Sequence, residues 1–180
     1  MRTYLSVPCG GITMKSSQDY KQKVKWCLSK KDGIKLTEPS ENLALDYEKK
    51  AKSALNIFES CLEKNELEWI AITGYFARYL TLYSIFAKCG IKSEIHDCTI
   101  SLMKYGFVDG GIIEEKCFEE LEEAKELRVK LQYYVAEHNS DEIREFSEKS
   151  REFVVKLNSV RNNMNKNDIK ILRDKIMKIR

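Results

Sequence analysis

Arginine occupies two positions of this 180-residue sequence at which a charged side chain is unexpected. Apolar residues recur at intervals of three and four from Cys117 to Val135, the spacing of one helix face, and Arg128 occupies one position of that face. Arg78 lies in the middle of the apolar stretch 69–87. Because an unpaired buried charge costs several kcal/mol, each guanidinium must be paired or must line a cavity.

Two aromatic residues, Tyr133 and Tyr134, follow Arg128 closely. An arginine presents five donors in a planar fork that matches phosphate oxygens, and aromatic rings stack on bases. We predict that Arg128 and Tyr133 line a cleft for a phosphate-bearing ligand, with Tyr134 contributing and His96 nearby as a donor. Arg128 and Tyr133 lie about 140° apart around an ideal helix, so they can share a site only across a dimer or at a loosened helix end.

Structural roles are the alternative for these side chains. Arg128 can instead pair with a carboxylate, while His96 caps the helix that follows it. For Arg78 the structural role is favoured, in which the side chain snorkels or pairs with an acid such as Glu94 or Asp97.

Familiar metal and nucleotide motifs are absent from the sequence, among them HExxH, the Walker loop and GxGxxG. The six cysteines include no CxxC pair, and His96 and His138 are the only histidines. We therefore predict no metal and no cofactor. The cysteines are expected to be reduced and unbound, mostly as small core residues, which is typical of a cytoplasmic protein.

Hydrophobic periodicity predicts an all-α fold with four main helices and small additions. The expected helices cover residues 19–29, 40–64, 67–89, 97–105, 113–137, 139–160 and 168–179. Ser40 is expected to cap the second helix, Gly90 and Gly106 to end the third and fourth, and Asn139 with Glu142 to form a capping box. The 67–89 helix is apolar on every side and is expected at the centre of a bundle, not in a membrane, because Arg78 interrupts it.

Charge is distributed unevenly along the chain. Residues 1–37 carry a net charge of +6, residues 38–158 carry −8 and residues 159–180 carry +5. We divide the chain into a basic N-terminal segment (1–38), a helical bundle (39–160) and a basic C-terminal helix (161–180). The basic ends are either ordinary solvated surface or a surface that attracts a polyanion such as RNA. The N-terminus lacks the apolar core of a secretory signal.

Four segments resemble the HEPN (higher eukaryote and prokaryote nucleotide-binding) domain family. They are an aromatic helix segment, a helix end, the loop before the next helix and an arginine-containing helix: Tyr75-Phe76-Ala77, Ala87–Lys92, Glu94–Ile100 and Glu126–Val135. The lead-in from Trp26 to Leu43 is similar to small stand-alone archaeal HEPN proteins. The resemblance covers roughly residues 24–158.

The resemblance implies an up-and-down bundle of four or five helices that forms a homodimer, with its cleft near the subunit interface. It implies nucleotide or RNA binding. Tyr75, in the aromatic segment, and Arg78, the charged residue of the same helix, are further candidates for ligand binding. HEPN nucleases use an arginine followed four to six residues later by a histidine. Arg128 matches that arginine, whereas Tyr133 and Tyr134 stand where the histidine belongs, and tyrosine is a poor base at neutral pH.

Two classes of function therefore follow from the sequence. The first is a HEPN protein that binds nucleotide or RNA, as the toxin-like component of a pair with a minimal nucleotidyltransferase, with a degenerate nuclease motif and Arg128 and Tyr133 as the catalytic candidates. The second is a non-catalytic helical homodimer that acts as a protein-interaction module.

Overall fold

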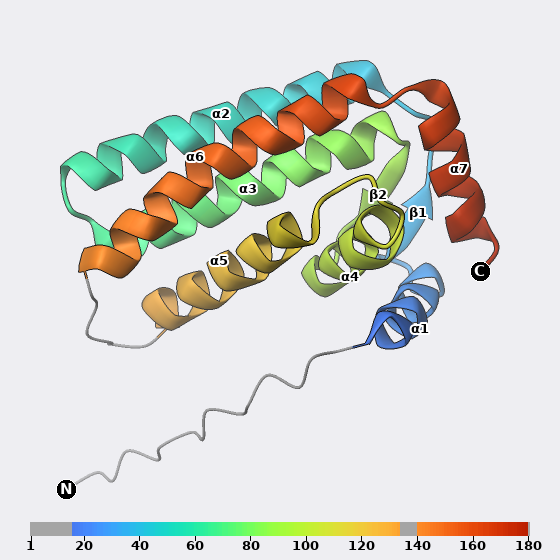
Figure 1. The fold of residues 1–180 in the computed structure, drawn as a ribbon, viewed down its shortest axis with the longest axis horizontal. Helices are drawn as coiled ribbons and strands as arrows, with labels where there is room; N and C mark the ends of the chain where they lie inside the picture. Colours follow the sequence, from blue (N-terminus) through green and yellow to red (C-terminus); the bar gives the residue numbers. More distant parts are fainter. Residues whose placement is uncertain (1–15, 134–139, 180) are drawn as a thin grey trace, which may run out of the picture.

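The computed structural model of the protein describes residues 16–133 and 140–179. Within these ranges the chain folds into helices and one short pair of strands, as Figure 1 shows. The elements in chain order are α1 (Ser17–Leu28), β1 (Ile34–Leu36), α2 (Glu41–Glu63), α3 (Leu67–Lys88), β2 (Ile91–Ser93), α4 (His96–Leu102), the π-helix η1 (Met103–Val108), α5 (Glu115–Tyr133), α6 (Ser140–Asn163) and α7 (Lys166–Met177). The predicted all-α class is confirmed.

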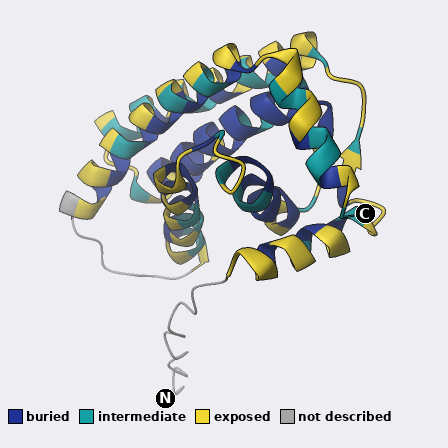
Figure 2. Ribbon diagram, turned by 45° about the vertical axis from the view of Figure 1, so that its right-hand side comes forward, coloured by how far each residue is buried: buried dark blue, intermediate teal, exposed yellow. Residues whose placement is uncertain are grey.

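Helix α3 lies at the centre of the bundle, as predicted. Helices α2, α5 and α6 pack along it, and its residues are buried over most of its length (Figure 2). Gly74 allows α6 to approach α3 closely, because a Cβ atom at this position would lie 2.7 Å from the ring of Phe146 on α6. No helix among the described residues is long and apolar enough to cross a membrane.

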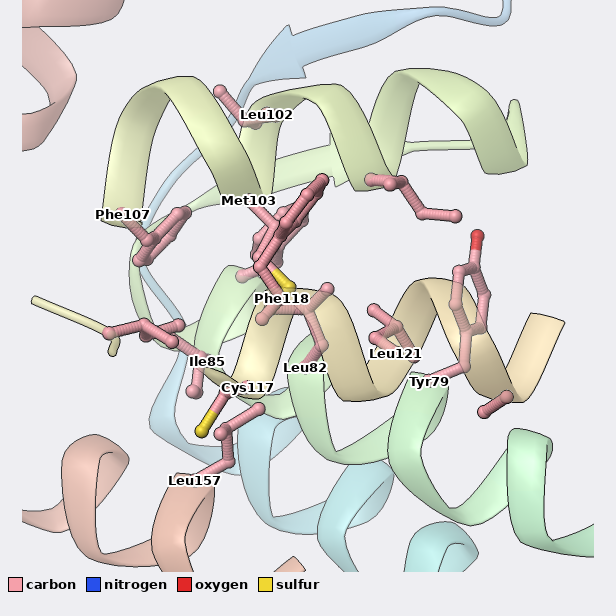
Figure 3. Close-up of a cluster of buried hydrophobic side chains, with 14 of the residues drawn as sticks. Tyr79, Leu82, Ile85, Leu102, Met103, Phe107, Cys117, Phe118, Leu121 and Leu157 are labelled. Carbon is pink, nitrogen blue, oxygen red and sulfur yellow. The ribbon is translucent and has the colours of Figure 1, made fainter. Parts of the chain in front are cut away.

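A large part of the core lies where α3, α4, α5, α6 and η1 meet. Figure 3 shows apolar side chains from these elements meeting between the ribbons. Contributors that the figure labels are Tyr79, Leu82, Ile85, Leu102, Met103, Phe107, Cys117, Phe118, Leu121 and Leu157, all of them buried. This packing attaches α4 and α5 to α3, and these are the elements that carry the candidate site residues.

Two of the predicted helix boundaries have the expected chemistry. The Ser40 hydroxyl accepts a hydrogen bond from the Leu43 amide at the start of α2. Gly90 follows the end of α3 with a φ of 66°, a conformation that favours glycine.

The predicted helix end at Gly106 is wrong. The chain continues through it as η1, which buries Phe107 in the core. At Gly106 a Cβ atom would lie 3.2 Å from Leu172 of α7, so the glycine accommodates a neighbouring helix and does not end its own. Residues 134–139, which include Tyr134, His138 and the predicted capping residue Asn139, lie outside the described residues.

Both basic segments are attached to the bundle. Strand β1 pairs antiparallel with β2, with Ile34 opposite Ser93 and Leu36 opposite Ile91. Helix α1 packs on α4 and η1. Helix α7 is held by Arg173, whose Nη1 donates to the carbonyl oxygens of Thr37, Cys89 and Gly90 at 2.8–2.9 Å.

Candidate functional site

Tyrosines recur every four residues along α3, at Tyr75, Tyr79 and Tyr83, and so lie on one face of the helix. Their rings form a row, with centroids 5.5 Å and 5.0 Å apart. His96, the first residue of α4, stacks on the middle ring, with centroids 4.4 Å apart and planes at 8°. The row therefore forms an aromatic support for an imidazole that comes from another helix.

The Tyr75 hydroxyl lies 3.0 Å from Nδ1 of His96. Burial raises the pKa of Tyr75 far above the neutral range, so this phenol keeps its proton. Partial burial lowers the pKa of His96, and the positive charges of Arg128 and Lys125 lower it further. A neutral His96 that accepts the Tyr75 proton at Nδ1 carries its own proton on Nε2.

Arg128 joins the same cluster from α5. Its guanidinium carbon lies 5.4 Å from the centroid of the Tyr75 ring and 5.8 Å from that of Phe76. Its Nε atom donates to Oε1 of Gln132 at 3.1 Å. Among the described residues Arg128 forms no ion pair, and no hydrogen bond of its two terminal nitrogens to them is found.

The neighbouring lysine is in a different electrostatic state. Lys125 lies one turn before Arg128 on α5 and donates to the Asp97 carboxylate at 2.7 Å. Its charge is balanced by that carboxylate, whereas Arg128 has no acidic partner among residues 16–133 and 140–179. In this part of the chain the cluster of Arg128, Tyr75 and His96 combines an unpaired guanidinium with a neutral imidazole, an arrangement that suits an anion.

A chain of hydrogen-bonded hydroxyl groups fixes the position of the middle tyrosine of the row. The Tyr79 hydroxyl donates to Oγ1 of Thr99 at 3.2 Å, and Thr99 in turn donates to Oγ of Ser93 at 3.0 Å. All three residues are buried. Sequence reasoning missed Tyr79, Thr99 and Ser93, although the four-residue spacing of the tyrosines is a signal that could have indicated the first.

Three of the predicted site residues therefore come together: Arg128, His96 and Tyr75. The predicted alternatives for the first two do not occur among the described residues, since Arg128 has no carboxylate partner and α4 begins after Ile95 without a side-chain cap. That these residues line a cleft remains a prediction.

Tyr133 is not part of this cluster. It is the last residue of α5, with 66% of its surface exposed. Within the described ranges it makes no ring contact or hydrogen bond to Arg128 or His96, in keeping with their separation around the helix. Tyr134 lies outside the described residues.

Arg78 is a structural residue, with 1% of its surface exposed. Its guanidinium donates to the carbonyl oxygens of Glu120 and Phe146 and to the Ser150 hydroxyl, and lies 4.6 Å from the centroid of the Phe146 ring. Burial lowers its pKa to about 10, so it stays charged at neutral pH beside the buried Glu120 carboxylate. The side chain therefore faces internal partners and not a ligand.

The predicted acidic partners of Arg78 are wrong, because those two acids form ion pairs with lysines instead. Glu94 pairs with Lys92 at 2.6 Å, and Asp97 pairs with Lys125. Which acid lies beside a central helix depends on how α5 and α6 pack, and the sequence does not state that.

The prediction that the cysteines are unbound is wrong for one pair. Cys27 of α1 and Cys98 of α4 form a disulfide, with Cα atoms 5.7 Å apart and a separation of 71 positions in sequence. Among the other described cysteines, Cys61, Cys89 and Cys117 are free. Burial raises the pKa of Cys89 to about 12 and that of Cys117 to about 11, so both are unreactive core residues.

No cluster of three or more metal-ligating side chains occurs among the described residues. Comparison of the sequence with protein-family models and with curated proteins finds no match.

Proposed function

We propose that the protein binds the phosphate of a nucleotide or of RNA at the cluster formed by Arg128, Tyr75 and His96. The observation that carries the proposal is the half-buried guanidinium of Arg128, which has no acidic partner among the described residues and lies over the Tyr75 ring. In this position the two terminal nitrogens can bind two phosphate oxygens at once. The imidazole of His96 is bridged to the same ring by the Tyr75 hydroxyl.

The resemblance to HEPN domains supports the same residue. The resemblance matches the family's functional arginine with Arg128, and we propose that His96 from α4, which stands beside Tyr75, takes the role of the motif's missing histidine. On this proposal the protein is a HEPN protein that acts as the toxin-like component of a pair with a nucleotidyltransferase. Cleavage of RNA would then require the other tautomer of His96, in which Nδ1–H donates to the Tyr75 hydroxyl and Nε2 accepts the proton of a 2′-hydroxyl. The lowered pKa of His96 keeps its imidazole neutral near pH 7, as a base must be.

The experiment is a nucleotide-binding and RNA-cleavage assay on the purified protein beside its Arg128→Ala and His96→Asn variants. If the proposal holds, Arg128→Ala loses nucleotide binding, while His96→Asn retains binding and loses any cleavage. Binding that Arg128→Ala does not alter would contradict it.

A non-catalytic interaction module is the second candidate, and exposed aromatic residues favour it. Trp69 and Phe76 lie two turns apart on α3 with 53% and 38% of their surfaces exposed, and Tyr133 is exposed at the end of α5. We propose that this apolar face forms the homodimer interface beside Arg128. Light scattering tests it: a dimer that becomes monomeric in Trp69→Ser/Phe76→Ser supports the module, and a monomer at micromolar concentration excludes it.

A further inference from the structure

The two basic segments of the sequence meet at one end of the molecule. Figure 1 shows α1, β1 and α7 together at that end. A hollow of about 530 Å³ lies between them, lined by residues 28–31, 34–36 and 176–177. A second hollow is lined by Gln22, Lys25, Trp26, Leu28 and Ser29, so the two share Leu28 and Ser29 and adjoin each other.

The charged side chains that line these hollows in the described part of the chain are all positive. Lys25, Lys30, Lys31 and Lys35 line them, all exposed. Within the described parts of the chain none of the four forms an ion pair, and no acidic side chain lines either hollow. The outer face of α1 is exposed in Figure 2.

Other basic residues of the same end have internal partners instead. Arg173 donates to three carbonyl oxygens, and Lys175 donates to the Tyr105 carbonyl at 2.7 Å. These two side chains fix α7 in place. Among the described residues, the lysines at the hollows make no such hydrogen bond, which suits them to bind an anionic partner.

An exposed aromatic ring lies beside the lysines of the hollows. Trp26 has 44% of its surface exposed, and the ammonium groups of Lys23 and Lys30 lie 4.3 Å and 4.8 Å from its ring centroid. A ring that can stack on a base, surrounded by ammonium groups that can pair with phosphates, is the combination that single-stranded nucleic acid requires. An anionic membrane would instead favour a continuous apolar face opposite the charges, whereas here two ammonium groups lie over the ring itself.

The surface is held in position before any partner binds. Residue 27, next to Trp26, is joined to α4 by the Cys27–Cys98 disulfide, and β1 is paired with β2. Ordering this segment therefore costs little on binding.

We propose that the basic surface formed by Lys25, Trp26, Lys30, Lys31 and Lys35 binds single-stranded nucleic acid, with a base on Trp26 and phosphates on the lysines. It shares no residue with the cluster around Arg128, so it goes beyond the nucleotide site and stands or fails independently of it.

The experiment follows the fluorescence of Trp26 in a Trp69→Phe background, where it is the only tryptophan, as a short oligouridylate is added. We expect the fluorescence to be quenched. Lys30→Gln/Lys31→Gln should raise the Kd about tenfold and reduce the slope of log Kd against log salt by about 1.4, since each phosphate contact to a single strand contributes about 0.7. Trp26→Ala, followed by fluorescence anisotropy of a labelled oligouridylate, should weaken binding about tenfold. The matched control Lys49→Gln/Lys52→Gln, on the exposed face of α2, should change neither quantity.

Three results would overturn the proposal. One is the absence of Trp26 quenching, and another is an equal effect of the control and test pairs of substitutions. The third is quenching by phosphatidylserine vesicles but not by the oligouridylate, which would assign the surface to a membrane. An Arg128→Lys variant separates this surface from the nucleotide site. If Arg128→Lys loses oligouridylate binding while Lys30→Gln/Lys31→Gln binds normally, the proposal for the basic surface is contradicted and the one for the site at Arg128 is supported.

Discussion

The hydroxyl of Tyr75 lies 3.0 Å from Nδ1 of His96, so a buried phenol of α3 fixes the orientation of an imidazole on α4. Arg128 lies over the ring of the same tyrosine. One aromatic side chain thus connects the basic group of one helix with the titratable group of another, and the predictions for this site depend on that connection.

The pKa of His96 is expected below its usual value of about 6.5, because partial burial and the charges of Arg128 and Lys125 disfavour the imidazolium. Arg128→Gln removes one of those charges and should raise the pKa. Tyr75→Phe removes a donor to the neutral ring and should also raise it. An NMR titration of the histidine ring measures each change, with His138 assigned by its own substitution. A pKa unchanged in both variants would show that the cluster does not form.

The lowered pKa of His96 also predicts how stability depends on pH. The unfolded chain binds a proton at His96 near pH 6.5, whereas the folded protein binds it only at lower pH. The contribution of His96 is therefore fully present above about pH 6.5 and is lost as the pH falls through the folded-state pKa. Urea unfolding at pH 7.5 and 5.5 should show a smaller loss in His96→Asn than in the unaltered protein. An equal loss in both would contradict this.

Replacing Arg78 by methionine should be strongly destabilising. The substitution leaves the buried Glu120 carboxylate with only Lys116, 3.9 Å away, as a positive partner in the described part of the chain, and removes the donors to Phe146 and Ser150. The expected loss is about 3–5 kcal/mol in the free energy of unfolding, measured by urea denaturation.

An exposed arginine supplies the control for Arg78. Arg151 pairs with Glu59 on the surface, and Arg151→Met should cost no more than about 1 kcal/mol. If Arg78→Met prevents folding, Arg78→Met/Glu120→Gln should restore it in part, because the neutral amide no longer needs the charge. Equal costs for the two single substitutions would contradict the structural role of Arg78.

The disulfide between Cys27 and Cys98 should stabilise the fold, because it closes a loop of 71 residues in the unfolded chain. Cys27→Ser should lower the free energy of unfolding by about 2–4 kcal/mol, and a reducing agent should have the same effect on the unaltered protein. Cys61→Ser, which removes a free cysteine, is the matched control. Alkylation of both Cys27 and Cys98 in the folded, unreduced protein would rule the disulfide out.

Local sequence signals predicted the helices because periodicity and capping are properties of neighbouring residues. The Ser40 cap, the end of α3 at Gly90 and the central position of α3 follow from residues close in sequence. The continuation of the chain through Gly106 as η1 was not predictable in this way, since Leu172 of α7 decides what fits at that position.

The candidate site was predictable only in part for the same reason. Arg128 was predictable as a site residue because it interrupts an apolar helix face. Its position over the Tyr75 ring depends on the packing of α5 against α3, which the sequence does not specify. The disulfide joins α1 to α4 across 71 residues, and the acceptors of Arg78 come from α5 and α6. Such contacts are fixed by tertiary packing, which neither periodicity nor spacing specifies.

The most direct test of the site at Arg128 is the affinity of the protein for the four nucleoside monophosphates, measured by isothermal titration calorimetry before and after Arg128→Lys. Lysine keeps the charge but lacks the planar fork, so it should keep the fold, checked by circular dichroism, and weaken binding at least tenfold. If Arg128→Lys binds the nucleotides as tightly as the unaltered protein, or if neither binds any of them, the phosphate site at Arg128 is contradicted.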